Sequence, residues 1–275
     1  MNRRAFALVE LVVSVVTLTV LLAVLLPVAH RKRQGDGLAM SLNNLRQITA
    51  ANTAYYADSG WAALRGARYS SGQITVGWDT WNHGGKNASS FWSSNFEESA
   101  YSRPLNAYLY PARIPQPPGY FNNHVNGAWT LNTGTPTPEQ RNGLQVRVFK
   151  SPGDVETRQR SWPNPTPGLS AYDDVGTSYL INMKWWDMPG LPSSFTLKYQ
   201  EGCMRIRNLF GMSSDYVYVT DQIGDILPNV SSPTYSLPGE FGKTNASALG
   251  FLDGRAEYRQ LLQGAASGPG YTFFP

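Results

Sequence analysis

Residues 3–29 read RRAFALVELVVSVVTLTVLLAVLLPVA. Two arginines precede an apolar run of 24 residues, Phe6 to Ala29, in which Glu10 is the only charged residue. As a helix this run would be about 36 Å long, whereas the hydrocarbon core of a bilayer is about 30 Å thick. A charged side chain inside such a segment costs roughly 2.5–3.5 kcal/mol, so it is expected to have a function. The sequence therefore predicts a transmembrane helix over residues 6–29 and a functional role for Glu10.

Two simpler interpretations of this stretch are a cleaved signal peptide and an uncleaved signal anchor. The apolar core of a cleaved signal peptide has only about 7–15 residues and ends at a small-x-small site. This run is longer, and its end, Pro27-Val28-Ala29-His30, has no good cleavage site. The plain signal anchor stays open as an alternative.

The net charge of +4 is a property of the membrane flanks. Arg3, Arg4 and the cluster Arg31-Lys32-Arg33 surround the apolar run, and residues 34–275 then hold 18 basic and 18 acidic residues. Because nucleic-acid binding needs a clustered basic face, we expect no nucleic-acid partner. The cluster after the run favours a cytoplasmic C-terminus on the positive-inside rule, but the first arginine pair can hold the N-terminus inside. We expect the N-terminus inside and the C-terminal head outside.

Apolar residues continue at helical spacing after the basic cluster, which predicts an amphipathic continuation of the helix over residues 30–58. These residues are Leu38, Leu42, Leu45, Ile48 and Tyr55. We expect one helix of roughly 80 Å from Phe6 to Ala57, half in lipid and half packed on a head. Gly35 and Gly37 are expected to loosen the helix between the two halves.

Beyond residue 60 the helical periodicity ends, and short strand-like runs alternate with connections rich in Gly, Pro and Asn. The runs are Gln73–Trp78, Leu144–Phe149, Ser178–Ile181, Asp215–Thr220 and Ala248–Leu252. Residues 59–275 are thus expected to form a globular head, with residues 82–143 as a long insertion. The predicted fold class is α+β, with a long N-terminal helix packed on a small antiparallel sheet with long loops.

No catalytic or metal-binding motif stands out, so we expect neither an enzyme nor a cofactor. His30 lies at the membrane flank, and His83 and His124, in the insertion, lack a metal-ligand spacing. We expect His83 and His124 to be surface loop residues. Asp215, Asp221 and Asp225 form a weak acidic cluster that is a candidate for calcium, although turn and strand-end carboxylates are the favoured interpretation.

Two further local features have structural interpretations. Asp253-Gly254 predicts a type I′ hairpin turn. The single cysteine, Cys203, excludes an intrachain disulfide and is expected to be a small buried residue.

The leader region resembles that of type IV prepilins and type II secretion pseudopilins: a short basic leader, a small residue before the cleavage site, Phe after it and Glu four residues later. This resemblance implies a leader at residues 1–5, cleavage between Ala5 and Phe6 by prepilin peptidase, and methylation of the new Phe6 amine. Most members have Gly where this chain has Ala5. It also implies that Glu10 meets the Phe6 amine of a neighbouring subunit during assembly, and that Pro27 bends the helix.

Downstream motifs are similar to those of the prepilin-type cleavage/methylation proteins of planctomycetes and verrucomicrobia. They are residues 43–48 (NNLRQI), 55–58 (YYAD), 77–79 (GWD), 103–109 (RPLNAYL), 149–154 (FKSPGD), 178–182 (SYLIN) and 250–257 (GFLDGRAE). Two positions depart from that pattern, because Ser151 stands where Cys is frequent and Lys243 stands where a His precedes Asp253-Gly254.

The resemblance implies a pilin-like structural subunit of a type II secretion pseudopilus or a type IV pilus-like filament. Its partners would be prepilin peptidase, other pilin or pseudopilin subunits and the inner-membrane assembly platform. It would be a single-pass protein of the inner membrane with its head in the periplasm, or part of a cell-surface filament. The alternative is a membrane-anchored display module whose eight tryptophans help to bind a carbohydrate or a secreted substrate.

Overall fold

The computed structural model describes residues 3–60, 67–70, 73–76, 80–87, 100–101, 103–110, 112–114, 123–125, 128–130, 142–158, 168–212, 214–231 and 235–275. Within these ranges, the side chains of residues 3–9, 30, 67–70, 73–76, 123–125, 128–130 and 195–196 are not described.

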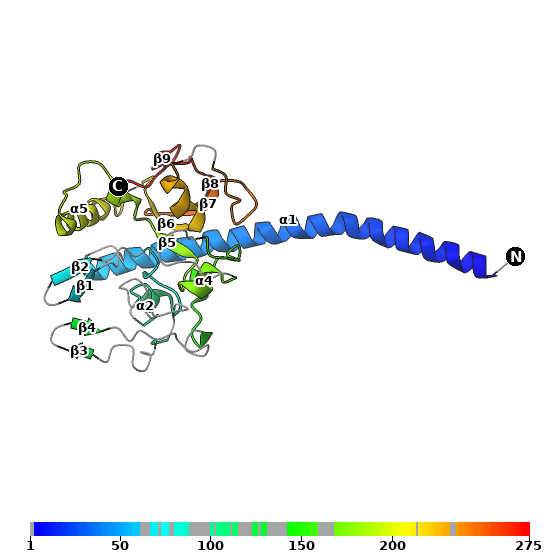
Figure 1. The fold of residues 1–275 in the computed structure, drawn as a ribbon, viewed down its shortest axis with the longest axis horizontal. Coiled ribbons are helices and arrows are strands. Elements are labelled where there is room, and N and C mark those ends of the chain that lie inside the picture. The colour runs from blue at the N-terminus through cyan, green and yellow to red at the C-terminus, as the bar shows by residue number, and fades with distance from the viewer. Residues whose placement is uncertain are drawn as a thin grey trace.

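The dominant element is helix α1, Arg3–Ser59, which has 57 residues and a length of about 85 Å. Figure 1 shows its N-terminal half projecting away from a head that packs on its C-terminal half. The expected loosening at Gly35 and Gly37 was wrong, because the helix is continuous through both. Phe241 and Pro152 lie 3.4 Å from the position that a Gly37 side chain would take, so packing of the head supports the helix there. Gly60 ends the helix with a positive φ of 75°, the usual C-terminal role of glycine.

The head is built on an antiparallel sheet in the order β5-β6-β7-β8. Its strands are β5 (Tyr179–Ile181), β6 (Val217–Asp221), β7 (Ala246–Phe251) and β8 (Ala256–Gln260). Helix α1 crosses β7 closely at Gly250, where an added Cβ would lie 2.7 Å from Val219 Cγ1 and 3.2 Å from Thr49 Cγ2. A long helix on a small antiparallel sheet confirms the α+β fold class.

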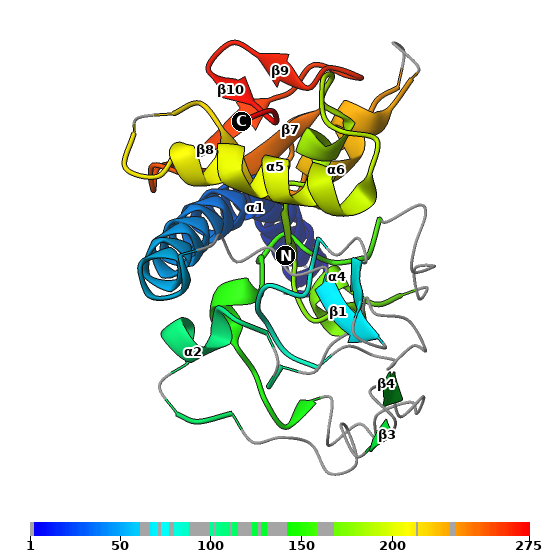
Figure 2. The same ribbon diagram turned by 90° about the vertical axis from the view of Figure 1, so that its left-hand side faces the viewer.

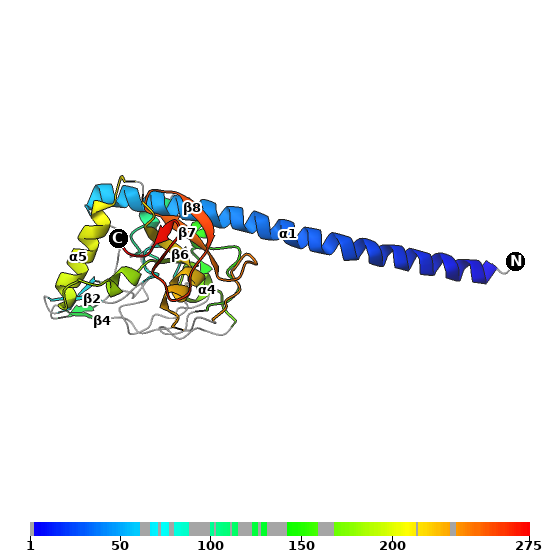
Figure 3. The same cartoon turned by 90° about the horizontal axis from the view of Figure 1, so that it is seen from above.

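Smaller elements complete the head around α1, and Figure 2, which looks along the helix, shows them on both sides of it. The helices are α2 (Asn106–Leu109), α4 (Ala171–Asp174), α5 (Phe195–Asn208) and α6 (Gln222–Ile226), with 3-10 turns η1 (Arg147–Phe149), η2 (Lys184–Asp187) and η3 (Leu227–Asn229). The remaining strands are β1 (Ala67–Ser70), β2 (Gln73–Val76), β3 (Asn123–Val125), β4 (Ala128–Thr130), β9 (Ser267–Gly268) and β10 (Tyr271–Thr272). Figure 3 shows α1 running along one side of the head.

Four of the five predicted strand regions contain strands, and two predictions about the head were wrong. Leu144–Phe149 contains the 3-10 turn η1 instead of a strand. Helix α5 was not expected at all, because no helical periodicity was recognised beyond residue 60. The ring of Trp185 occupies the space that a side chain at position 202 would need, so Gly202 allows α5 to pack closely on Trp185. This tertiary packing overrides the weak helix propensity of glycine.

The core of the head joins α1 to the sheet. Leu45 and Ile48 are completely buried and belong to the same cluster as Tyr218, Val219 and Trp185. Cys203 is also buried there, as predicted, and burial raises the pKa of its thiol to about 12.

Candidate assembly surface on the N-terminal helix

The head does not cover the projecting half of α1. Every residue from 10 to 29 is exposed, and the apolar window reaches a mean hydropathy of 2.8 with none of it buried. By length and composition, α1 contains one segment able to cross a membrane. Such a surface is unstable in water and needs lipid or another protein to cover it.

Glu10 lies near the start of this exposed segment and is itself exposed. The predicted processing site, Ala5 and Phe6, lies within α1, where the structure describes the backbone and not the side chains. One helical turn, about 6 Å along the axis, separates Phe6 from Glu10.

Three hydroxyl side chains follow Glu10 in the apolar segment, and all three bond to their own helix. Ser14 Oγ donates to the Glu10 carbonyl, Thr17 Oγ1 to Val13 and Thr19 Oγ1 to Val15, each at 2.8 Å. This bonding satisfies the hydroxyl donors without help from water, which makes the residues tolerable in an apolar layer.

Pro27 lies inside α1 without ending it. A proline in a helix removes one backbone hydrogen bond and produces a bend. Figure 1 shows a gentle curve of α1 rather than a break, and the bend at Pro27 stays a prediction.

Buried polar contacts fix the other half of α1 to the head. Ser41 Oγ and Tyr179 Oη are 3.0 Å apart, and Asn44 Nδ2 donates to the Lys150 carbonyl at 3.0 Å. Tyr218 Oη donates to Asn52 Oδ1 at 2.6 Å. Such bonds require one rotational and axial setting of the helix, so the head is joined rigidly to the projecting segment.

The three weak calcium candidates do not converge. Asp221 is buried and caps α6 by accepting from the amides of Ile223 and Gly224, and it also accepts from Ser247 Oγ at 2.6 Å. Asp215 is exposed and pairs with Arg255. Among the described residues, no group of three or more His, Cys, Asp or Glu side chains is arranged to hold a metal ion.

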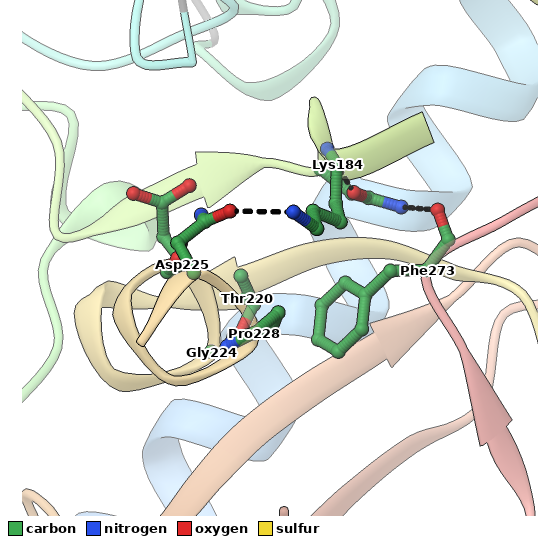
Figure 4. A pocket seen from close by; sticks show the side chains of 8 residues that line it. Lys184, Thr220, Gly224, Asp225, Pro228 and Phe273 are labelled. Carbon is green, nitrogen blue, oxygen red and sulfur yellow. Dashed lines mark hydrogen bonds between the residues drawn. The ribbon is translucent and has the colours of Figure 1, made fainter. Parts of the chain in front are cut away.

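Asp225, the third candidate, lines a cavity of only about 10 Å³ between α6, η2 and the C-terminal segment. Figure 4 shows the Asp225 carboxyl at one end of this pocket and the Phe273 ring at the other, with Lys184 between them bonded to Asn229. Burial raises the pKa of Asp225 to about 6, and the Lys184 charge opposes this rise. The space is about that of one water molecule, so it is not a ligand site.

Asp253 and Gly254 lie in the hairpin between β7 and β8, as expected, but the turn is not of type I′. Gly254 has a positive φ of 91°, whereas Asp253 does not. The Gly254 amide donates to the Phe251 carbonyl and the Phe251 amide donates to Arg255, which is the pattern of a three-residue loop with one glycine in the left-handed region. Arg255 then lies 3.8 Å from the centroid of the Phe251 ring.

The tryptophans that the structure describes with their side chains are packing residues. Trp185 is completely buried, and Trp81 and Trp186 are 5% and 7% exposed. The side chains of Trp61, Trp78, Trp92, Trp129 and Trp162 lie outside the description. The adjacent pair Trp185-Trp186 is therefore not an exposed binding face.

The expectation that His83 is a surface loop residue was wrong. His83 is 1% exposed and its ring lies 5.5 Å from that of Phe149. Burial, reinforced by the Arg103 charge, lowers the pKa of His83 to about 3. The side chains of His30 and His124 lie outside the described set.

The sequence analysis did not identify several buried polar residues whose hydrogen bonds and ion pairs connect parts of the head. Asp154, from the Ser-Pro-Gly-Asp motif, accepts from the amides of Ala171 and Tyr172 and from Ser178 Oγ. Lys86 is fully buried and pairs with Asp173. The motif at 149–154 was a usable signal for Asp154, whereas nothing local marks Lys86 as buried.

A hollow with a volume of about 410 Å³ lies beside α2. Tyr101, Arg103, Tyr110 and Arg113 are among its lining residues. Arg103 donates hydrogen bonds to the carbonyls of Trp81, Gly84 and Val175, so its guanidinium is committed to the fold.

Comparison with protein-family models, curated proteins and solved structures yields no match for this chain.

Proposed function

We propose that this protein is a pilin-like structural subunit, stored in the inner membrane by α1 and assembled into a type II secretion pseudopilus or type IV pilus-like filament. The observation that carries this proposal is the division of α1. One half is fixed in the head by buried polar and apolar contacts, while residues 10–29 are entirely exposed and apolar apart from Glu10 and three hydroxyl residues. A helix of this kind can pass from lipid into a bundle of like helices, with the head carried along as a rigid body.

Processing would prepare the subunit for this transfer. Cleavage by prepilin peptidase between Ala5 and Phe6 would create a new amine about one helical turn from Glu10. In an assembling bundle, the Glu10 carboxylate of one subunit and the Phe6 amine of the next would neutralise each other, which avoids two isolated charges in an apolar layer. The inner-membrane assembly platform would supply the driving machinery, and the head would lie in the periplasm.

A display module that binds carbohydrate or a secreted substrate is less well supported. That function would require exposed aromatic side chains in the head. Trp81, Trp185 and Trp186 are buried, which supports a structural use of the aromatic residues that the structure describes.

The test is a Glu10→Ala variant of the full chain, produced in its native host. We expect the variant to enter the membrane in normal amounts but to be absent from filaments isolated by shearing or affinity capture. Thr19→Val is the control, because it also changes one polar residue of the apolar segment and should assemble normally. Incorporation of the Glu10→Ala chain at the level of the unaltered protein would contradict the proposal.

A further inference from the structure

Lys86 is a buried amine to which the proposed function assigns no role. Its side chain is fully buried and pairs with Asp173, whose side chain is 38% exposed. The Lys86 amine also lies 4.9 Å from the centroid of the Tyr172 ring. Lysine side chains are almost never fully buried unless they are paired, because removal of their charge from water is costly. The head therefore holds a nucleophilic group in surroundings where an apolar side chain is usual.

The side chain of Asn142 meets this amine. Lys86 Nζ donates to Asn142 Oδ1 at 3.3 Å, although the two residues are 56 positions apart in the sequence. The carbon bonded to that oxygen, Asn142 Cγ, is the electrophilic atom of the amide. Groups held at about 3–3.5 Å in a suitable orientation react far faster than free ones. Asn142 is itself exposed, so its side chain can turn Cγ toward the amine and a leaving group can escape into water.

Asp173 supplies a base beside the amine. Lys86 bonds to Asp173 Oδ1, while Ser170 Oγ donates to Asp173 Oδ2 at 2.9 Å. Partial burial raises the pKa of Asp173, but the hydrogen bonds from Lys86 and Ser170 outweigh this effect and hold the pKa below its usual value. The carboxyl group is therefore ionised and can accept a proton. Because burial disfavours the charged form of lysine, transfer of a proton from Lys86 to Asp173 is easier there than in water.

We propose that Lys86 and Asn142 become joined by an amide bond between their side chains. Lys86 Nζ gives a proton to Asp173 and attacks Asn142 Cγ. The attacking nitrogen then loses a second proton and the Cγ–Nδ2 bond breaks, with both protons passing through Asp173 to the leaving nitrogen. The products are the side-chain amide and one ammonium ion, and Asp173 is ionised again. The reaction consumes no oxidant and no other reactant.

The bond would close residues 86–142 into a covalent loop. These residues make up nearly all of the expected insertion, 82–143, so the bond would hold the two ends of the insertion together. As with a disulfide, a closed loop lowers the conformational entropy of the unfolded chain and so stabilises the folded one. The inference goes beyond the proposed function and does not rest on it.

Peptide mapping of the full chain, purified in detergent, tests for the bond. In an unmodified chain, trypsin cuts after Lys86 and releases Asn142 in the peptide 142–147, because Arg141 and Arg147 flank that peptide. We expect instead an uncut Lys86 that carries the peptide 142–147, with the mass of one ammonia missing. Cleavage after Lys86 and a separate peptide 142–147, either unchanged or with its Asn142 amide hydrolysed, would overturn the proposal.

Two substitutions test the roles of the groups, with tryptophan fluorescence to show that each variant is folded. Asn142→Ala changes an exposed residue and should abolish the branched peptide without affecting the fold. Asp173→Asn removes the base. Because general base catalysis contributes about 10²–10⁴-fold to a rate, we expect only a trace of the branched peptide. An undiminished yield from the folded Asp173→Asn chain would contradict the role of Asp173.

A second lysine provides a matched control. Lys184 Nζ donates to Asp187 Oδ2 and to Asn229 Oδ1, each at 2.9 Å. Its side chain is 20% exposed, so water solvates its charge. We expect no branched peptide between Lys184 and Asn229, and Asp187→Asn should leave the yield of the Lys86–Asn142 bond unchanged. A bond at Lys184 and none at Lys86 would overturn the proposal.

Discussion

Glu240 shows how single residues of the head depend on their surroundings. Its Oε2 accepts from Ser151 Oγ at 2.6 Å, while the buried Oε1 has no hydrogen-bond partner among the described residues. Burial and the nearby charges of Asp221 and Asp154 raise the pKa of Glu240 well above 4.5. Burial also raises the pKa of Asp221, to about 6, but the hydrogen bonds that Asp221 accepts oppose this rise. Glu240 is therefore the carboxyl group that holds its proton to the higher pH.

This arrangement predicts a pH dependence of stability. The folded carboxyl group holds its proton more tightly than the unfolded one, so its contribution is complete below about pH 4.5 and is lost as the pH rises toward the elevated pKa. We expect the urea midpoint of the full chain in detergent to fall over this range. Glu240→Gln mimics the protonated form and should flatten the dependence.

The matched control is Glu201→Gln, which removes a carboxylate paired with Arg205 on α5 and should retain the slope. A midpoint of the Glu240→Gln chain that falls with pH as steeply as that of the unaltered chain would contradict this account of Glu240.

At the scale of elements, the two halves of α1 have different roles, and matched substitutions can separate them. Leu45 is completely buried against the sheet, whereas Leu21 is 53% exposed. Leu45→Ala should lower the free energy of unfolding of the head by about 2–5 kcal/mol, because it leaves a cavity. Leu21→Ala should leave it unchanged. Denaturant unfolding followed by tryptophan fluorescence measures both, and equal losses would show that the projecting half also supports the head.

The sequence predicted those elements whose signal is local. Helix α1 follows from its apolar run and helical spacing, and β6 and β7 from short apolar runs between turns. Gly35 and Gly37 misled the prediction, because whether a glycine loosens a helix depends on packing elsewhere in the chain. Phe241 packs beside Gly37 and supports the helix there.

Among the candidate site residues too, only those with a local sequence signal could be predicted. Glu10 could be identified from sequence because a charge in an apolar run is conspicuous. The burial of His83 and Lys86 could not, since it depends on contacts with α4 and η1, which are distant in sequence. The turn at Asp253-Gly254 was located correctly. Its type depends on the register of β7 and β8, which the dipeptide alone does not determine.

At the scale of the whole molecule, a rigid head and a projecting apolar helix form one body. Figure 1 shows the N-terminus at the far end of α1 and the C-terminus within the head. The shape suits a subunit that is held in a membrane by one end and stacks by the same helix. The remaining step is the exposure of the Phe6 amine, on which the proposed pairing with Glu10 depends.

Mass spectrometry of the N-terminus of the protein isolated from its native host tests this account most directly. We predict a chain that begins at N-methylated Phe6. A chain that still begins at Met1, or one that begins near His30 after removal of the apolar segment, would contradict it.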